Sequence, residues 1–226
     1  MLLSVIIPVY NEKDTIKEVI QKISLIDIPK EIIVVDDYSC DGTRDALAEI
    51  KREGVRVFYH ERNRGKGAAV STGLGYVIGD IVIIQDADLE YDPREYPNLI
   101  NPIIECKADA VYGSRFLGGP HRVLFFWHYV GNKIITTFSN MLSNLNLTDM
   151  ETGYKAFRTD VIRSLNLKSN RFGFEPEVTM KLAKSKYRIY EVSISYWGRD
   201  YSEGKKITWK DGAAALWHIV RFRYFD

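Results

Sequence analysis

Cysteine is scarce in this sequence: among 226 residues only Cys40 and Cys106 occur, too few for a disulfide framework. We therefore expect both thiols to be free, as in a cytosolic protein. Long hydrophobic runs are also lacking, because the nearest one, residues 123–130, contains His128 and falls far short of the roughly 20 residues that a membrane span needs. The first ten residues carry neither a basic leader nor a small-residue cleavage site, which argues against a signal peptide. The sequence thus predicts a cytoplasmic chain, either free or peripheral on the cytoplasmic membrane face.

An excess of one charge sign is missing as well. The 31 Lys and Arg residues nearly balance the 30 Asp and Glu residues, and the formal net charge is +1. This balance argues against nucleic acid as a partner, so a local patch must meet any charged ligand. The hydrophobic share of 46% and the charged share of 27% are ordinary for a globular protein, and the length suits one domain, residues 1–226.

Apolar, β-branched runs alternate with segments of helical period along the first half of the chain. Strands are predicted at residues 3–9, 31–35, 55–59, 80–84 and 108–112, and helices at residues 15–26, 43–52 and 65–78. This alternation predicts a Rossmann-like α/β fold, in which helices flank a mostly parallel sheet. In the second half we expect a long helix at residues 123–147, a strand at 188–196 and an amphipathic C-terminal helix at 208–225.

Acidic residues recur where the predicted strands end. Asp36 and Asp37 follow one strand, and Asp86 and Asp88 follow another. In open α/β sheets ligands bind at the carboxyl ends of the strands. Two carboxylates one residue apart suit a hard divalent ion that keeps open positions for phosphate oxygens, and such an ion neutralises the charge on a leaving diphosphate. The alternative, a solvated polar strand terminus, stays open on this pair alone.

Several further segments accompany the acidic pair in a fixed order along nearly the whole chain. They are residues 4–12, 34–43, 63–67, 85–88, 112–115, 149–157 and 199–206. This ordered set resembles the family-2 inverting glycosyltransferases with the GT-A fold. Within that family it looks like the polyprenyl-phosphate branch, the dolichyl-phosphate mannose synthases and undecaprenyl-phosphate sugar transferases. The resemblance implies a divalent metal (Mg²⁺ or Mn²⁺), a UDP- or GDP-sugar as donor, and a polyprenyl phosphate as acceptor.

The resemblance also assigns residues to the donor side of the site. The base and ribose pocket would be lined by Pro8, Tyr10, Glu12 and Asp37. Asp36, next to Asp37, is a less certain member of this pocket. It is equally interpreted as a turn residue that caps the helix beginning at Gly42-Thr43. Lys66 opens a glycine-rich helix and would face the donor phosphate, although close packing of this helix start on the sheet is at least as good an interpretation.

The metal would be held mainly by Asp88 together with Asp86, which also belongs to the donor pocket. Glu90 stands where the mannose synthases often have Gln. Ligation by this glutamate is plausible, but it adds negative charge to the site. We therefore predict Glu90 as a third metal ligand, with less support than Asp86 and Asp88.

The acceptor side is expected to use four residues: Asp149, Arg115, Arg199 and Lys205. By resemblance Asp149 is the catalytic carboxylate. A hydroxyl acceptor needs a base to take its proton, whereas a phosphate with a second pKa of about 6 is already mostly dianionic, so Asp149 would then orient rather than deprotonate. A guanidinium at Arg115 suits a phosphate, and a basic loop with Arg199 and Lys205 would clamp phosphates. Each also has a structural interpretation: Asp149 as a residue that caps a turn, Arg115 as one half of a surface ion pair, and Arg199 and Lys205 as parts of a solvated loop.

Aromatic segments occur at Phe125-Phe126-Trp127 and around Trp209, Trp217 and Tyr224, the latter with Arg221 and Arg223. Such helices fit a membrane surface or ordinary core packing, and both remain open. We expect residues 1–115 to bind the nucleotide sugar and residues 116–226 to shape the acceptor side. The alternatives are transfer to a hydroxyl of a soluble glycan, and a non-catalytic nucleotide-binding module.

Overall fold

The computed structural model describes residues 1–226 with the exception of residues 51, 124, 172 and 201–208. The strands are β1 (Leu3–Val9), β2 (Lys30–Asp36), β3 (Val55–Tyr59), β4 (Ile81–Ile84), β5 (Ala110–Ser114), β6 (Lys155–Arg158) and β7 (Ile189–Ser193). The helices are α1 (Ile16–Ser24), α2 (Thr43–Ala48), α3 (Lys66–Leu74), α4 (Tyr96–Ile104), α5 (Phe126–Ser143), α6 (Thr159–Ser164), α7 (Phe174–Lys184) and α8 (Trp209–Tyr224), with a short 3-10 helix η1 (Pro93–Glu95) before α4.

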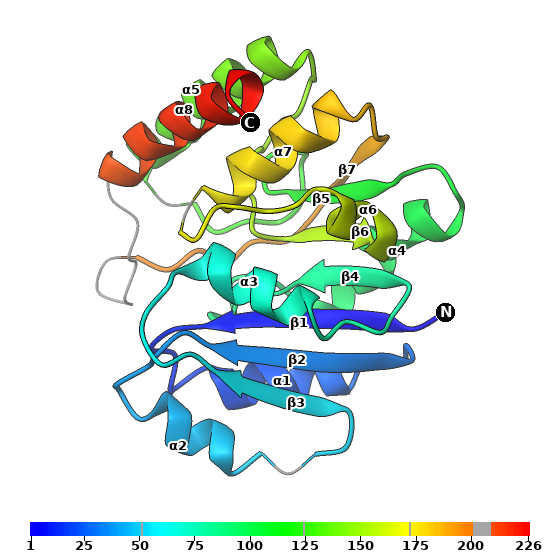
Figure 1. The fold of residues 1–226 in the computed structure, drawn as a ribbon, viewed down its shortest axis with the longest axis vertical. Coiled ribbons are helices and arrows are strands. Elements are labelled where there is room, and N and C mark those ends of the chain that lie inside the picture. Colours follow the sequence, from blue (N-terminus) through cyan, green and yellow to red (C-terminus); the bar gives the residue numbers. More distant parts are fainter. Residues whose placement is uncertain (51, 124, 172, 201–208) are drawn as a thin grey trace.

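The strands form one sheet in the order β3-β2-β1-β4-β6-β5-β7. All neighbouring pairs are parallel except those of β6, which runs antiparallel to both β4 and β5. The carboxyl ends of β1 to β4 therefore meet at one edge, on the left in Figure 1. Because β6 runs the other way, its first residue, Lys155, pairs with Ile84 and Tyr112 near the ends of β4 and β5. The segment that leads into β6 is thus delivered to the same edge.

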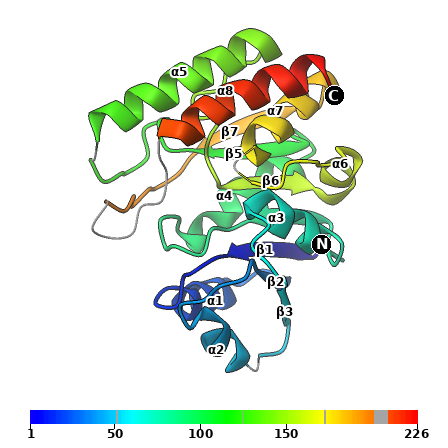
Figure 2. The same ribbon diagram turned by 60° about the vertical axis from the view of Figure 1, so that its left-hand side comes forward.

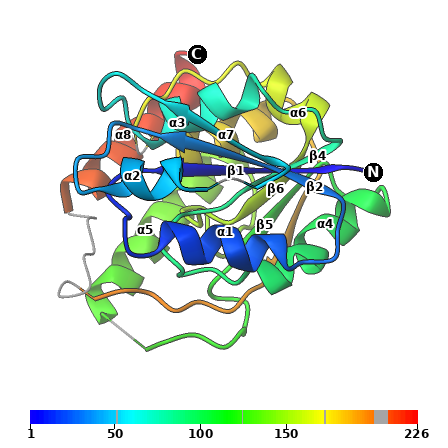
Figure 3. The ribbon, with the colours of Figure 1, turned by 90° about the horizontal axis from the view of Figure 1, so that it is seen from below.

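Helices cover both faces of the sheet, and each face has its own apolar core. Helices α1, α2 and α4 pack on one face and α3, α6 and α7 on the other. Figure 3 shows α1 and α4 below the sheet and α3, α6 and α7 above it. Helix α1 illustrates the cause: Ile16, Val19, Ile20 and Ile23 are buried, which is the spacing of one helical face. Helices α5 and α8 lie side by side beyond α7, far from β3 (Figure 2).

The structure confirms the predicted α/β class with a mostly parallel sheet, and adds elements that the sequence patterns did not reveal. These are β6, α4, α6 and α7. The long helix predicted at residues 123–147 is shorter, since α5 ends where Asn144 adopts a left-handed conformation (φ 58°). No helix within the described parts of the chain is long and apolar enough to cross a membrane.

Candidate active site

The turns that follow the central parallel strands are unusually tight. Asn11, Tyr38 and Leu89, which come after β1, β2 and β4, have positive φ angles of 53°, 69° and 62°. Side chains tie these turns together: Asn11 Oδ1 accepts a hydrogen bond from the Cys40 amide at 2.9 Å, and Ser39 Oγ accepts one from the Asn11 amide at 2.9 Å. Positive φ at residues other than glycine costs energy and clusters at functional sites. This edge of the sheet is therefore the place where a site is expected.

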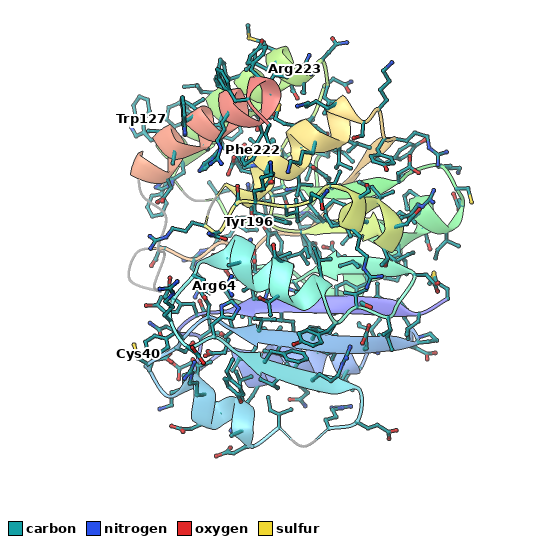
Figure 4. The ribbon with its side chains drawn as sticks, viewed as in Figure 1. Cys40, Arg64, Trp127, Tyr196, Phe222 and Arg223 are labelled. Atoms are coloured by element: carbon teal, nitrogen blue, oxygen red, sulfur yellow. The ribbon has the colours of Figure 1, made fainter. Side chains whose placement is uncertain are left out.

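Asp37 anchors the segment that leads into α3. Its carboxylate accepts hydrogen bonds from the amides of Arg64 at 2.8 Å and Gly65 at 2.6 Å, and it lies 2.7 Å from His60 Nδ1. A base N–H, the partner expected from the sequence, would have to share these oxygens. Figure 4 labels Arg64 and Cys40 on this side of the molecule. Asp37 thus fixes the helix start that carries Lys66.

The alternative interpretation of Asp36 is wrong for the cap of α2 but right for the turn, since the Asp36 carboxylate accepts a hydrogen bond from the Ser39 amide at 3.2 Å. The N-cap residue of α2 is Gly42, and the Thr43 amide donates to Asp41 Oδ1 at 2.9 Å. Asp36 is instead buried at the end of β2, where it accepts a hydrogen bond from Arg44 Nε at 2.7 Å. The Arg44 side chain is thereby held at the carboxyl end of β2.

Lys66 lies between two carboxylates from distant parts of the chain. Its Nζ is 2.8 Å from Asp86 Oδ1 and 3.0 Å from Glu175 Oε1. Burial lowers the pKa of Lys66, but Asp86 and Glu175 outweigh it and hold that pKa well above its usual value. Gly153 packs against this group, since a Cβ at this glycine would lie only 2.2 Å from Asp86 Oδ2. Lys66 is thus a fixed positive charge beside the first carboxylate of the acidic pair.

Arg199 lies among three further carboxylates, those of Glu12, Asp88 and Glu90, which together with Asp86 form an acidic cluster. Its guanidinium reaches Asp88 Oδ2 at 3.1 Å and Glu12 Oε2 at 3.1 Å, and its amide donates to Glu90 Oε1 at 2.8 Å. Glu90 also accepts a hydrogen bond from Tyr196 Oη at 2.9 Å. Burial, with the neighbouring charges of Glu90 and Asp86, raises the pKa of Asp88 to about 8. The cluster therefore holds more negative charge than Arg199 alone compensates.

Asp149 and Arg115 form a buried ion pair. The carboxylate is fully buried and accepts from Arg115 Nε at 2.6 Å, from Arg115 Nη2 at 2.8 Å and from Asn132 Nδ2 at 3.2 Å. Burial acts to raise the pKa of Asp149, but Arg115 outweighs it, and the pKa lies below its usual value. The guanidinium also lies over the Tyr196 ring, 5.1 Å from its centroid. Asp149 is consequently ionised and engaged at neutral pH.

The sequence patterns assigned no role to three charged residues near Asp149 and Arg115: Glu151, Lys155 and Glu175. Lys155 Nζ is buried and donates to the carbonyl groups of Met150, at 3.0 Å, and Thr152. Burial lowers the pKa of Lys155 to about 8, while burial and Glu175 raise that of Glu151 to about 8. For Lys155 and Glu175 the available signal was a charged residue between apolar neighbours, whereas Glu151 stands in a polar segment and gave no such signal.

Asp86 and Asp88 have the chemistry of a divalent-ion site, and Glu90 as a third ligand stays a prediction. Among the residues that the structure describes, no group of three or more His, Cys, Asp or Glu side chains is arranged to hold a metal ion. Mg²⁺ commonly takes only one or two carboxylates and completes its shell with substrate phosphates and water. Asp86 and Asp88 suit this pattern, since they lie one residue apart just beyond β4.

The remaining sequence-predicted residues are placed as follows. Tyr10 is exposed just beyond β1, and Pro8 lies half-buried within β1. Lys205, together with Ser202 and Lys206 of the basic loop, lies outside the described residues. The structure thus brings Glu12, Asp88 and Arg199 into direct contact, and Lys66 onto Asp86.

Comparisons with known proteins agree with this arrangement. Residues 4–165 match the family described as Glycosyl transferase family 2. The chain is 30% identical over 241 residues to an undecaprenyl-phosphate mannosyltransferase of Micrococcus luteus, covering 96% of this chain and 97% of that protein. It is 31% identical over 236 residues to a dolichol-phosphate mannosyltransferase of Pyrococcus furiosus, covering all of this chain and 65% of that protein.

A solved structure supports the fold. Glucosyl-3-phosphoglycerate synthase from Mycobacterium tuberculosis, in complex with Mn²⁺, UDP and glucosyl-3-phosphoglycerate, superposes with a TM-score of 0.74 at 21% identity, covering 97% of this chain and 77% of that one. The sheet order, the acidic pair at the strand ends and the match over most of the sequence lead to one conclusion: this chain belongs to glycosyl transferase family 2 and is a glycosyltransferase with the GT-A fold.

Proposed function

We propose that the chain transfers a sugar from a UDP- or GDP-sugar to a polyprenyl phosphate, with inversion at the anomeric carbon. The observation that carries this proposal is the state of Asp149, which is fully buried, ionised and paired with Arg115. A carboxylate with a lowered pKa is a poor base, so the site suits an acceptor that needs no deprotonation. A phosphate monoester is such an acceptor, since its second pKa is about 6. The names of the relatives from Micrococcus luteus and Pyrococcus furiosus support the same acceptor class.

The residues at the sheet edge divide the work. The base and ribose would lie against Pro8, Tyr10, Glu12 and Asp37. Asp86 and Asp88 would hold Mg²⁺ or Mn²⁺, which when bound supplies positive charge to the leaving diphosphate. Glu90 would join them only by sharing an oxygen with Tyr196 or the Arg199 amide. Lys66 adds a fixed positive charge next to Asp86.

The transfer itself is a single displacement. An oxygen of the acceptor phosphate forms a bond to the anomeric carbon while the bond from that carbon to the donor diphosphate breaks, and the electron pair leaves with the nucleoside diphosphate. Asp149 and Arg115 fix the geometry on the acceptor side, and Arg199 and Lys205 would bind the phosphates. Neither a proton transfer nor a covalent enzyme intermediate is needed for this step.

The surface formed by α5 and α8 is the part that we propose to face the lipid or a membrane partner. Exposed large apolar side chains gather there: Phe126, Trp127 and Met141 on α5, and Trp217, Tyr224 and Phe225 on or after α8. The opposite side of α8 packs inward through Ala215, Ile219 and Phe222. Figure 4 labels Trp127 near one end of these helices. Exposed aromatic residues favour the headgroup zone of a bilayer.

One assay tests the proposal. The protein is incubated with a panel of labelled UDP- and GDP-sugars and Mn²⁺ or Mg²⁺, with polyprenyl phosphate, the corresponding polyprenol or a soluble glycan as acceptor. We expect label in the lipid phase with the phosphate alone, released by mild acid. Transfer to the polyprenol or to the glycan would contradict the assignment of the acceptor. No transfer from any nucleotide sugar would contradict the assignment of the donor.

A further inference from the structure

The guanidinium of Arg199 contacts Asp88, one of the two carboxylates that the proposed function gives to the metal. It lies 3.1 Å from Asp88 Oδ2, 3.1 Å from Glu12 Oε2, and 3.5 Å from Glu90 Oε1. These three carboxylates come from the segments after β1 and β4, so that one cation balances charge from both. A divalent ion on Asp88 would therefore meet a positive charge already in place.

The hold on this guanidinium is incomplete. Arg199 Nε is buried and makes no hydrogen bond with any described residue, only the ion-pair contact with Glu90 Oε1 at 3.5 Å. The other two nitrogens bond to Glu12 and Asp88. The main chain is held separately, since the amides of Trp197 and Arg199 donate to the carbonyl and carboxylate oxygens of Glu90 at 3.1 Å and 2.8 Å. The side chain alone has to move for Arg199 to release Asp88. A buried donor without a hydrogen bond favours such a move.

We propose, building on the proposed function, that Arg199 is the counter-ion of the metal site in the free protein and competes with the divalent ion for Asp88. Binding of the donor diphosphate determines whether Asp88 binds Arg199 or the metal. The diphosphate oxygens bind the metal and offer the guanidinium a bidentate anionic partner in place of the carboxylates. The metal alone therefore binds weakly, and metal and diphosphate strengthen each other's binding, as the linkage of two ligands requires. Arg199 thus prevents a stable metal complex without donor and becomes a phosphate ligand once the donor arrives.

The test measures metal binding rather than turnover. Free Mn²⁺ is followed by its electron paramagnetic resonance signal during titration of the full chain, first with Mn²⁺ alone and then with UDP or GDP present. For Arg199→Ala and Arg199→Gln we expect Mn²⁺ alone to bind about tenfold more tightly than to the wild type, within the range usual for coupled sites. With nucleoside diphosphate present, the same variants should bind Mn²⁺ more weakly than the wild type.

A matched control is Arg94→Ala. Arg94 pairs with Asp92 at 2.5 Å, two residues beyond Glu90, and its side chain is 81% exposed. This variant changes the net charge by the same amount close to the site and should leave Mn²⁺ binding unchanged. Unchanged or weaker binding of Mn²⁺ alone to both Arg199 variants would overturn the competition. The double variant Asp88→Asn with Arg199→Ala should lose the tight binding, and if it does not, the metal assignment fails and the competition with it.

Discussion

Replacing Asp149 by asparagine separates the two roles that a buried carboxylate at this place can have. Asparagine keeps the shape of the side chain but leaves the Arg115 guanidinium buried, with its 2.6 Å and 2.8 Å contacts deprived of a counter-charge. Removing one partner of a buried ion pair costs about 3–5 kcal/mol of unfolding free energy. Each kcal/mol lowers the Tm of a chain of this length by about 2–4 °C, so we expect the Tm to fall by roughly 6–20 °C, measured by thermal unfolding.

The effect on transfer should be smaller than the loss of a general base. Removing a base costs about 10²–10⁴-fold in rate, whereas we expect the folded variant to lose only about tenfold in kcat with a polyprenyl phosphate, because positioning alone is disturbed. The acid limb of the pH–rate profile should remain near pH 6, since it belongs to the acceptor phosphate. A loss of the limb, or of more than about 10³-fold in kcat at an unchanged Tm, would refute the reasoning and make Asp149 a base.

Two further variants control this experiment. The double variant Arg115→Gln with Asp149→Asn removes both charges and should recover about 1–3 kcal/mol relative to the sum of the single changes. Asp160→Asn removes a carboxylate that also pairs with an arginine, Arg158, at 2.6 Å, but its side chain is 66% exposed. An exposed pair contributes about 0–1 kcal/mol, so its Tm should hardly change.

Three other outcomes follow from the structure. Gly153→Ala would push a methyl group against Asp86 Oδ2. Because small misplacements at such a site are costly, we expect the Mn²⁺-dependent affinity for nucleoside diphosphate, measured by calorimetry, to fall at least about tenfold. Unchanged affinity would contradict the contact. Hydrogen bonds from Arg188 lower the pKa of Asp109 to about 2, so the stability it adds is complete above its unfolded pKa of about 3.9 and is lost as the pH falls toward 2. In urea, Asp109→Asn should lower the unfolding free energy by about 1–2 kcal/mol at pH 7, with the difference shrinking below pH 4; a difference as large at pH 2.5 as at pH 7 would contradict the pair. Trp127→Ala should weaken co-sedimentation with anionic liposomes at low salt, and equal co-sedimentation would remove α5 from the contact with lipid.

The sequence patterns predicted the first half of the fold well because buried parallel strands are continuous apolar runs. β1 and β4 are examples, each almost wholly buried. β6 escaped because it is four residues long and begins with Lys155, whose charge is buried and satisfied by carbonyl groups. α7 was not predicted for a related reason. The charge of Glu175 and Glu177 places them on a solvent face in the sequence pattern, whereas tertiary contacts bury both.

The positions of the site residues were predictable in part, and their pairings were not. Strand ends place Asp37, Asp86 and Asp88 at one edge by topology alone. The contact of Arg199 with Asp88 spans 111 residues of sequence, and that of Lys66 with Glu175 depends on the packing of α7. Such partners are fixed only by the complete fold. The roles assigned to these residues, and the division of the chain at residue 115, stay predictions.

The antiparallel strand between β4 and β5 determines how the chain can be divided. A fragment of residues 1–115 would contain β5, but both hydrogen-bonded neighbours of β5, β6 and β7, belong to the remainder. The same cut would leave β4 as an open edge of four apolar residues, Ile81–Ile84. Open, uncharged edges promote pairing between molecules and aggregation. The half that is predicted to bind the nucleotide sugar is therefore expected to be insoluble by itself. Donor and acceptor functions have to be dissected by substitution in the full chain rather than by truncation.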